Sequence, residues 1–217
     1  MEPTRMKLYE FAPTRSIRVR WVLQELGVDF EAISIRLPAG EHRTPVFLEL
    51  NPAGKLPVLV DGEQTITESV AIALYLAEKY PDRHFIPTDL LLRSQLYRWL
   101  FFTVTELEQP LWRIARHTAL YPEALRLPDE IPIARQDFTN MAVVMENHLL
   151  NRQFVVGEQV TVADFILAYT LDWANEIQLL DPFPTLVTYL KRMYERPKAP
   201  MRIAAALTRI SADESSQ

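Results

Sequence analysis

Cysteine is missing from this chain of 217 residues. Its absence excludes disulfide bonds, and it excludes any catalytic chemistry that uses a thiol of the protein itself. Histidine is also scarce, since there are only four, and their scattered positions lack the close spacing that metal ligands share. We therefore expect neither a protein thiol in catalysis nor a bound metal.

Long apolar runs are absent as well. No run approaches the roughly 18 residues that a membrane-spanning helix needs. The first six residues, Met-Glu-Pro-Thr-Arg-Met, lack the charged-then-apolar pattern of a signal peptide. The net charge of −5 disfavours nucleic acid and anionic membranes as partners. We therefore expect a cytoplasmic protein that binds neither nucleic acid nor membranes.

The composition is that of a soluble globular protein. Apolar residues make up 48% of the chain, which is enough for a sizeable core, and charged residues make up 24%. The length fits one large domain or two small ones. The charges are mixed along the chain, and we find no internal repeat and no low-complexity tract.

The first 80 residues alternate between strand and helix patterns in the order β-α-β-α-β-β-α. The first β-α-β unit implies a right-handed parallel crossover, and Asp61-Gly62 is a hairpin signal between two short strands. The predicted strands are 6–11, 30–35, 57–60 and 64–67, and the predicted helices are 16–26, 44–50 and 69–80.

The rest of the chain reads as helical. We expect a first domain over residues 1–82, a linker over 83–88 and an all-helical domain over 89–217. Pro110 should kink or split the long helical segment 89–119. The other predicted helices are 132–150, a helix from a capping box at Thr161–Asp164 to Leu180, and 184–196; the tail 211–217 is expected to fray.

Two short motifs in the first domain have both a structural and a functional interpretation. Pro57 is either an ordinary first residue of a strand, or it leaves the backbone of Leu56 free to pair with an extended ligand. Ser69 can simply cap the helix that follows, with Glu68 beside its positive end. Alternatively, this helix start binds a carboxylate and Glu68 binds an ammonium, which together match an α-amino acid group.

A third motif is the turn that joins the first strand to the first helix. The hydroxyl of Thr14 or Ser16 either caps that helix or donates a hydrogen bond to a ligand thiolate. A hydrogen bond to a charged group is worth about 1.5–3 kcal/mol, which lowers a thiol pKa by about one to two units. Starting from about 8.5, most of the thiol is then ionised at neutral pH.

Taken together, these stretches resemble the cytosolic glutathione S-transferase family over nearly the full length of the chain. The resemblance rests on Leu8-Tyr9 with the turn 13–20, on Asn51-Pro-Ala-Gly-Lys-Leu-Pro-Val-Leu59, on Glu68-Ser69, on Thr161–Asp164 and on Arg196-Pro197. It implies an α+β thioredoxin-like N-terminal domain, an all-α helical-bundle domain, glutathione as co-substrate and a homodimer.

The resemblance also implies roles for single residues. It implies that the Leu56-Pro57 bond is cis and that the backbone of Leu56 pairs with the cysteinyl part of glutathione. It assigns Glu68-Ser69 to the γ-glutamyl end, and His42 and Lys55 to the glycine carboxylate.

The catalytic position is where the chain departs from the family pattern, because family members use tyrosine, serine or cysteine there. Alignment on Arg18-Val19-Arg20 puts Thr14 where theta- and zeta-like members carry serine, and Arg15 where beta-like members carry cysteine. We predict Thr14 as the hydroxyl donor to the thiolate, with Ser16 second. Arg15 or Arg18 could add positive potential, although an arginine on an exposed helix is usually solvated.

The predicted function is attack of the glutathione thiolate on a small hydrophobic electrophile in a groove between the domains. The candidate lining residues are Phe11, Phe102, Glu106 and Arg113. A peroxidase, isomerase or dehalogenase activity stays open, and the sequence identifies neither the electrophile nor the class. The alternative is a module that keeps the fold for binding or regulation without catalysis.

Overall fold

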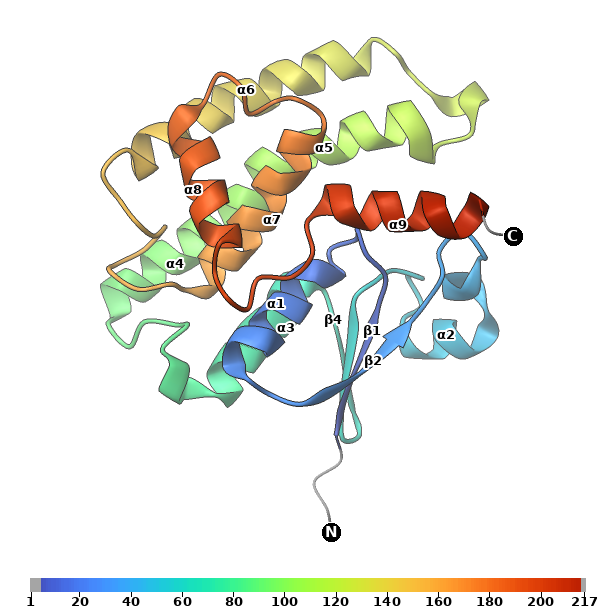
Figure 1. Ribbon diagram of the computed structural model, residues 1–217, viewed down its shortest axis with the longest axis horizontal. Coiled ribbons are helices and arrows are strands. Elements are labelled where there is room, and N and C mark those ends of the chain that lie inside the picture. The colour runs from blue at the N-terminus through green and yellow to red at the C-terminus, as the bar shows by residue number, and fades with distance from the viewer. Residues whose placement is uncertain (1–4, 216–217) are drawn as a thin grey trace. The chain divides into compact units, whose positions relative to one another are not determined.

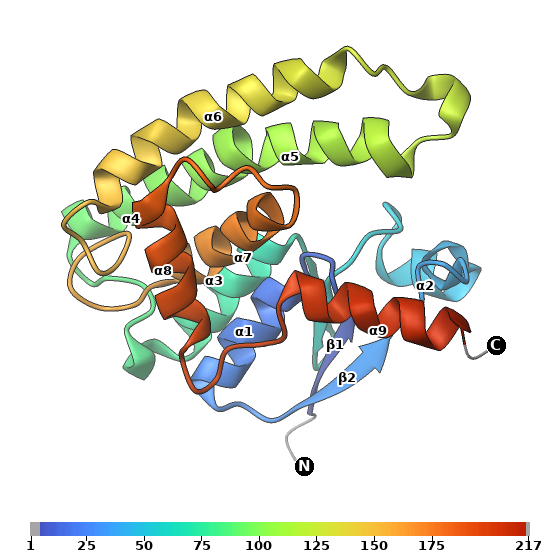
Figure 2. The ribbon, with the colours of Figure 1, turned by 45° about the horizontal axis from the view of Figure 1, so that its top comes forward.

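The computed structural model describes residues 5–215 of the chain, and side chains up to residue 212 (Figures 1 and 2). It consists of two compact units. The first unit contains the residues up to Ile86 together with those from Arg196 onward, and the second contains Pro87–Glu195. The boundary after Ile86 lies inside the expected linker 83–88. The expected second domain 89–217 differs from the structure at its end, because residues from 196 onward pack with the first unit.

The core of the first unit is a four-stranded sheet in the order β2-β1-β3-β4. β1 and β2 are parallel and β4 is antiparallel to β3, which confirms the predicted parallel pair and the predicted hairpin. β3 is antiparallel to β1, a pairing that the sequence did not indicate. The strands are β1 (Met6–Glu10), β2 (Phe30–Ser34), β3 (Val58–Asp61) and β4 (Gln64–Thr67).

Helices cover both faces of this sheet. α1 packs against α3 on one face, and on the other face the ring of Tyr9 meets the ring of Phe47 from α2 at a centroid distance of 6.3 Å. α1 ends because Gly27 adopts a left-handed conformation with φ 71°. These helices are α1 (Ser16–Leu26), α2 (Pro45–Leu50) and α3 (Ser69–Lys79), with short 3-10 turns at Glu41–Arg43 and Pro81–Arg83.

A further helix, α9 (Ile203–Ser215), completes the first unit and was not predicted. In both ribbon views it crosses the carboxyl ends of β1 and β2 (Figures 1 and 2). Ile203 and Ala206 are buried. The expectation that residues 211–217 fray is therefore wrong for 211–215, whereas 216–217 lie outside the described residues.

The second unit is helical, and α5 and α6 lie side by side in it (Figure 1). The long segment before residue 120 is interrupted by a π-helical turn, Thr103–Leu107, which directly precedes the turn that contains Pro110. Proline lacks the N–H of a regular helix and its ring clashes with the carbonyl four residues earlier, so the break occurs there. The helices are α4 (Leu90–Phe102), α5 (Glu108–Ala115), α6 (Glu130–Leu149), α7 (Val162–Glu176) and α8 (Pro184–Tyr194), with a second π-helical turn at Arg116–Leu120 and a 3-10 turn at Glu123–Leu125.

The predicted capping box opens α7. Asp164 accepts hydrogen bonds from the backbone N–H of Thr161 at 2.7 Å and of Val155 at 2.8 Å, and from the hydroxyl of Tyr189 at 2.8 Å. Burial raises the pKa of Asp164, and these hydrogen bonds oppose that rise. α7 is buried over most of its length, and it ends at Glu176 rather than at Leu180.

Within residues 5–215, no helix is both long and apolar enough to cross a membrane.

Candidate functional site

The Leu56-Pro57 peptide bond is cis, as the resemblance implied, and it directly precedes β3. The side chain of Leu56 is buried in a small apolar cluster with Phe47 and Val58. Within residues 5–215 the backbone of Leu56 makes no hydrogen bond. An extended ligand can therefore pair with this backbone while the side chain stays anchored in the cluster.

The loop before this step is held by Asn51. Its Nδ2 donates to the carbonyl of Lys55 at 2.8 Å, and its Oδ1 accepts from the N–H of Ala53 at 3.1 Å. The N–H of Gly54 donates to the carbonyl of Asn51 at 2.8 Å. These bonds fix the backbone that presents Lys55, which is one of the two residues expected near a ligand carboxylate.

His42, the other of these two residues, lies against the same loop. A Cβ atom on Gly54 would lie 3.0 Å from the carbonyl oxygen of His42 and 2.9 Å from Nη1 of Arg43. Burial, and then the neighbouring charge of Arg43, lowers the pKa of His42, so its imidazole is neutral at neutral pH. The structure therefore brings His42 and Lys55 to one loop and adds Arg43, a cation that sequence reasoning missed.

Glu68 and Ser69 form the start of α3. The structure corrects the prediction that Ser69 is the capping residue, because Ser69 is the first residue of the helix and Glu68 is its N-cap. Glu68 is exposed and has φ 67° and ψ 112°, in a region that favours glycine. Non-glycine residues in such conformations cost about 1–3 kcal/mol and concentrate at functional sites.

The hydroxyl of Ser69 has a partner that the sequence did not indicate. Nη1 of Arg18 in α1 donates to Oγ of Ser69 at 3.3 Å, and Arg18 is only 1% exposed. We expected an arginine in this helix to be solvated, and that expectation is wrong for Arg18. Its charge adds to the positive end of α3, which makes this corner of the first unit suited to a carboxylate.

The first turn contains a closed set of hydrogen bonds between Phe11, Thr14 and Ser16. The N–H of Phe11 donates to Oγ of Ser16 at 3.3 Å, and that oxygen lies 2.7 Å from Oγ1 of Thr14. Oγ1 of Thr14 donates to the carbonyl of Phe11 at 2.5 Å and accepts from the N–H of Ser16 at 3.3 Å. Ser16 is buried, whereas Thr14 is half-buried. Thr14 must therefore redirect its hydroxyl hydrogen from Phe11 in order to donate to a ligand.

The same turn holds two further features. The Ala12-Pro13 bond is also cis, which the sequence did not indicate. Arg15 is the N-cap of α1, and its side chain makes no capping hydrogen bond.

The four residues predicted to line an electrophile pocket lie in both units. Phe11 belongs to the first unit, while Phe102, Glu106 and Arg113 belong to the second. Arg113 donates to Glu130 at 2.8 Å and to Asp137 at 2.6 Å, and these hydrogen bonds raise its pKa.

Phe102 and Glu106 have neighbours of their own in the second unit. Phe102 meets the ring of Trp99 edge-on at a centroid distance of 5.2 Å. Glu106 accepts from the hydroxyl of Thr105 at 3.0 Å and lines a cavity of about 180 Å³ with Asp137.

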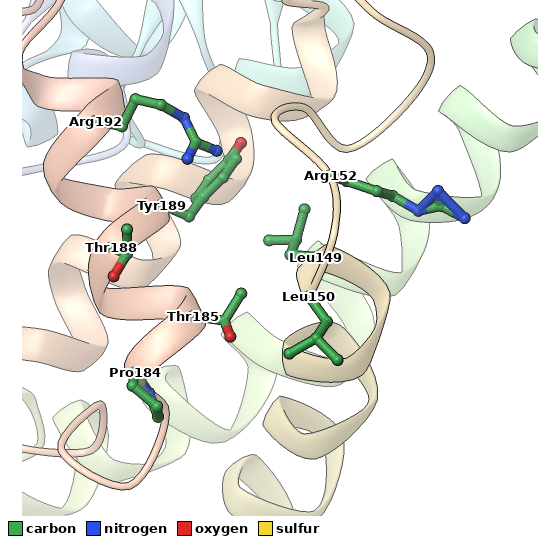
Figure 3. Close-up of a pocket in the computed structure, with 8 residues that line it drawn as sticks. All are labelled: Leu149, Leu150, Arg152, Pro184, Thr185, Thr188, Tyr189 and Arg192. Atoms are coloured by element: carbon green, nitrogen blue, oxygen red, sulfur yellow. The ribbon is translucent and has the colours of Figure 1, made fainter.

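Another cavity of the second unit, of about 290 Å³, lies where the end of α6 approaches α8 (Figure 3). Tyr189 and Arg192 of α8 lie on one side of it, and Leu149 at the end of α6 and Leu150 directly after it lie on the other. None of the residues that the sequence singled out for chemistry lines this cavity. Among residues 5–215, no group of three or more histidine, aspartate and glutamate side chains is arranged to hold a metal ion.

Comparison with known proteins gives consistent matches over both units. The profile of the glutathione S-transferase N-terminal domain matches residues 4–78, and that of the glutathione S-transferase C-terminal domain matches residues 117–197. A zeta class glutathione S-transferase of Euphorbia esula is 33% identical over 166 residues, which are 75% of this chain and 73% of that protein. Glutathione S-transferase Z1 of Arabidopsis thaliana is 30% identical over 198 residues, 89% of each protein.

A solved structure agrees with these sequence matches. The glutathione transferase URE2P6 from Phanerochaete chrysosporium, in complex with oxidized glutathione, has a TM-score of 0.80 against this chain at 26% identity. The match covers 98% of this chain and 97% of that one.

Proposed function

Because the chain belongs to the glutathione S-transferase family, we propose that it is a glutathione transferase that ionises the glutathione thiol for attack on a small hydrophobic electrophile. The observation that carries this proposal is that the first unit has two groups ready to bind a peptide. One is the unpaired backbone of Leu56 beside a cis proline, and the other is the start of α3, where Ser69 accepts a hydrogen bond from the buried Arg18. Together they suit a peptide that ends in an α-amino acid group.

Each end of glutathione has proposed contacts. The backbone of Leu56, held by Pro57, pairs with the cysteinyl part. The γ-glutamyl carboxylate binds Oγ of Ser69 and the N–H groups at the start of α3, while Glu68 binds the ammonium. Lys55 and the neutral imidazole of His42 bind the glycine carboxylate. These contacts place the sulfur by the first turn, so binding energy is used to orient it.

The proposed activation is a hydrogen bond to the thiolate from Thr14. The thiol releases its proton to solvent, and the hydroxyl of Thr14 turns from the carbonyl of Phe11 to donate to the sulfur. Thr14 is the better candidate of the two hydroxyls because it is more exposed than Ser16, which is 1% exposed. Arg15, at the start of α1, adds positive potential. The sulfur then attacks the electrophilic carbon, and the carbon–sulfur bond forms as the bond from that carbon to its leaving group breaks. The leaving group departs into solvent with the electron pair of the broken bond.

The electrophile and the oligomeric state are also part of the proposal. We propose Phe11, Phe102, Glu106 and Arg113 as contacts of the electrophile. The protein acts as a cytoplasmic homodimer, with transferase activity as the main reaction. Peroxide reduction, isomerisation and dehalogenation are possible side reactions of the same thiolate. The alternative function is a non-catalytic module that keeps the glutathione fold for docking.

The test is the ultraviolet absorbance of the thiolate in bound glutathione, titrated between about pH 5 and 9. The thiol pKa should lie about one to two units below the free value of about 8.5. Thr14→Ala should return it toward the free value, because the donor is lost. Thr65→Ala removes an exposed threonine of β4 and should leave the titration unchanged.

A second variant separates binding from activation. Ser69→Ala should weaken glutathione binding by about tenfold, which is the loss of one hydrogen bond to a charged group, and should leave the pKa of the bound thiol unchanged. A lowered thiol pKa that survives Thr14→Ala would move the donor to Ser16 or to a backbone N–H. Failure of the unmodified protein to bind glutathione would favour the docking module.

A further inference from the structure

The cavity between the end of α6 and α8 lies within the second unit and has no part in the function proposed above (Figure 3). None of the residues that we propose to bind glutathione or the electrophile lines it. Leu150, Pro184 and Thr188 of its wall are exposed, so the cavity opens to solvent. Its volume of about 290 Å³ is close to the lower end of the usual range of about 300–1,000 Å³ for ligand pockets, which suits a small molecule.

Arg192 of α8 is the main polar group of the cavity wall. Its Nη2 donates to the carbonyl of Gln153 at 2.5 Å, and its Cζ lies 5.3 Å from the centroid of the ring of Tyr189 (Figure 3). Tyr189 is itself fixed, because it is only 1% exposed and its hydroxyl donates to Asp164 at 2.8 Å. The guanidinium is therefore held in place before any ligand binds, which reduces the entropy cost of binding.

The positive charge of Arg192 is not balanced by a carboxylate. Arg192 forms no ion pair with any side chain among residues 5–212, and none of the lining residues is acidic. Glu146 in α6 is engaged elsewhere, because its carboxylate accepts from the N–H groups of Thr185 and Leu186, both at 2.9 Å. Nε of Arg192 is buried and has no acceptor in the part of the chain that the structure describes. A buried donor costs free energy unless a ligand or water accepts from it, so an anion suits this side of the cavity.

A second cation adds positive potential at the end of α6. Arg152 belongs to the wall and forms no ion pair with another described side chain, and in Figure 3 its side chain extends away from Arg192. Burial lowers the pKa of His148 in the last turn of α6, and the hydrogen bond that its Nε2 donates to a backbone carbonyl opposes this. The charges of Arg152 and Arg98 lower that pKa further, so positive potential reaches this turn. With two cations and no carboxylate in its described wall, the cavity favours an anion with two charges.

The other side of the cavity is apolar. Leu149 and Leu150 lie across the cavity from Thr185 in Figure 3, and Pro184 adds a third apolar residue. A wall of this kind suits hydrocarbon, whereas inorganic phosphate or sulfate has no apolar surface to place against it. The hydroxyl of Thr185 is a further donor for an oxygen of the ligand. The wall therefore matches a ligand that combines a charged group with a short hydrocarbon part.

We propose that this cavity binds the phosphate monoester of a small alcohol. The phosphate group carries about 1.5 to 2 negative charges near pH 7. It pairs with Arg192 and accepts from the buried Nε, in the field of Arg152, while the alkyl part packs against Leu149 and Leu150. The proposed glutathione contacts lie in the first unit, so both ligands bind at the same time. The inference does not depend on the proposed transferase reaction.

The test is calorimetric titration of the full chain with four related probes. Propyl phosphate has both the charge and the alkyl chain, inorganic phosphate lacks the chain, 1-propanol lacks the phosphate, and butanoate carries the chain with a single charge. Propyl phosphate should bind most tightly, about threefold more tightly than inorganic phosphate, because its chain is buried against the leucines. 1-Propanol should not bind measurably, because it has no charge to pair with the arginine.

Variants separate the charged side of the cavity from the apolar side. Arg192→Gln should weaken both phosphates by about tenfold, because a charge-assisted hydrogen bond is lost. Leu150→Asn replaces an exposed side chain and should weaken propyl phosphate by about threefold, while inorganic phosphate binds as before. Lys191→Gln is the matched control, because it removes a positive charge from the adjacent position of α8 without touching the cavity wall. It should change neither affinity.

Circular dichroism of each variant checks that it is folded, and Leu150→Asn still tests the site if Arg192→Gln does not fold. Saturating glutathione should leave the affinity for propyl phosphate unchanged in the unmodified protein. The proposal is overturned if neither phosphate binds, if butanoate binds as tightly as propyl phosphate, if Arg192→Gln and Lys191→Gln behave alike, or if glutathione displaces the probe.

Discussion

Two residues of the candidate site have backbone conformations that the sequence alone does not explain. Glu68 has φ 67° although it carries a side chain, and Gly54 has φ 61° in the loop before the cis proline. Strain of this kind persists where the surrounding structure over-determines it, and Glu68 lies directly before the N–H groups that begin α3. We infer that the unusual backbone conformations of these two residues cost free energy of folding and shape the binding site.

Gly54→Ala tests whether the close approach of this loop to residues 42–43 matters. The new Cβ would lie 2.9 Å from Nη1 of Arg43 and 3.0 Å from the carbonyl oxygen of His42, closer than ordinary contacts. The left-handed conformation alone costs a side chain about 1–2 kcal/mol. We expect Gly54→Ala to lower the free energy of unfolding by more than this, and to weaken glutathione binding, because Lys55 shifts. Urea unfolding and calorimetric titration measure the two effects.

Gly40 provides the matched control. It has a similar φ of 74°, but a Cβ there would meet nothing within 4 Å. Gly40→Ala should therefore show only the conformational cost and should bind glutathione normally. If both variants lost the same stability, the new Cβ at residue 54 would not be crowded by His42 and Arg43. The loop that contains Gly54 could then move away from the 3-10 turn Glu41–Arg43.

At the scale of elements, β3 is joined to α3 by a small polar cluster. Asp61 at the end of β3 accepts from the hydroxyl of Tyr75 at 2.6 Å and from Nζ of Lys79. Burial opposes ionisation of Asp61, but the hydrogen bonds from Lys79 and Tyr75 outweigh it and lower the pKa of Asp61 below its ordinary value of 3.8. The hydrogen bond that Lys79 donates to Asp61 raises the pKa of Lys79 above its ordinary value of 10.5.

The signs of these shifts predict a plateau of stability. A carboxyl group whose pKa is lower in the folded than in the unfolded protein stabilises the fold at pH values above its unfolded pKa. This stabilisation is lost as the pH falls through its folded pKa. An amine whose pKa is higher in the folded protein stabilises the fold at pH values below its ordinary pKa of 10.5. This stabilisation is lost as the pH rises through its folded pKa. We expect Asp61→Asn to cost about 1 kcal/mol between about pH 5 and 9, since the cluster is partly exposed, and less below about pH 3.8. Urea unfolding at pH 7 and pH 3 measures it, and an equal cost at both values would contradict it.

Periodicity predicted most elements of this fold, because buried positions recur along each strand and helix. The order of the first seven elements, the break near Pro110 and the capping box at Thr161–Asp164 all follow from local patterns. α9 was missed although Ile203, Ala206, Leu207 and Ile210 show a helical spacing. The small polar residues 211–217 directly after them do not continue that spacing.

The parts of the site that the sequence could not provide are contacts between distant segments. The burial of Arg18 depends on α1 packing against α3, and its hydrogen bond to Ser69 joins residues 51 positions apart. The approach of Arg43 to Gly54 likewise depends on how two loops meet. Residue types and spacing indicate which groups are present in a chain, whereas such pairings appear only when the elements are packed together.

At the scale of the whole molecule, the chain leaves the first unit after Ile86 and returns to it at Arg196. At this return, Nε and Nη2 of Arg196 donate to the carboxylate of Glu25 in α1 at 2.6 Å and 2.8 Å, which forms an ion pair. The side chain of Glu25 is 9% exposed, and it also accepts from Nε1 of Trp21 at 3.2 Å. A carboxylate this buried becomes costly when its cation is removed.

Arg196→Gln should therefore loosen the last segment of the chain from the first unit. We expect the free energy of unfolding to fall by about 1–3 kcal/mol, measured by urea unfolding, because Glu25 keeps its charge and loses its partner. Arg36→Gln breaks a similar pair with Glu41, but that pair is exposed and should matter little. Equal stability of the two variants would mean that packing of α9, rather than this ion pair, holds the end of the chain in the first unit.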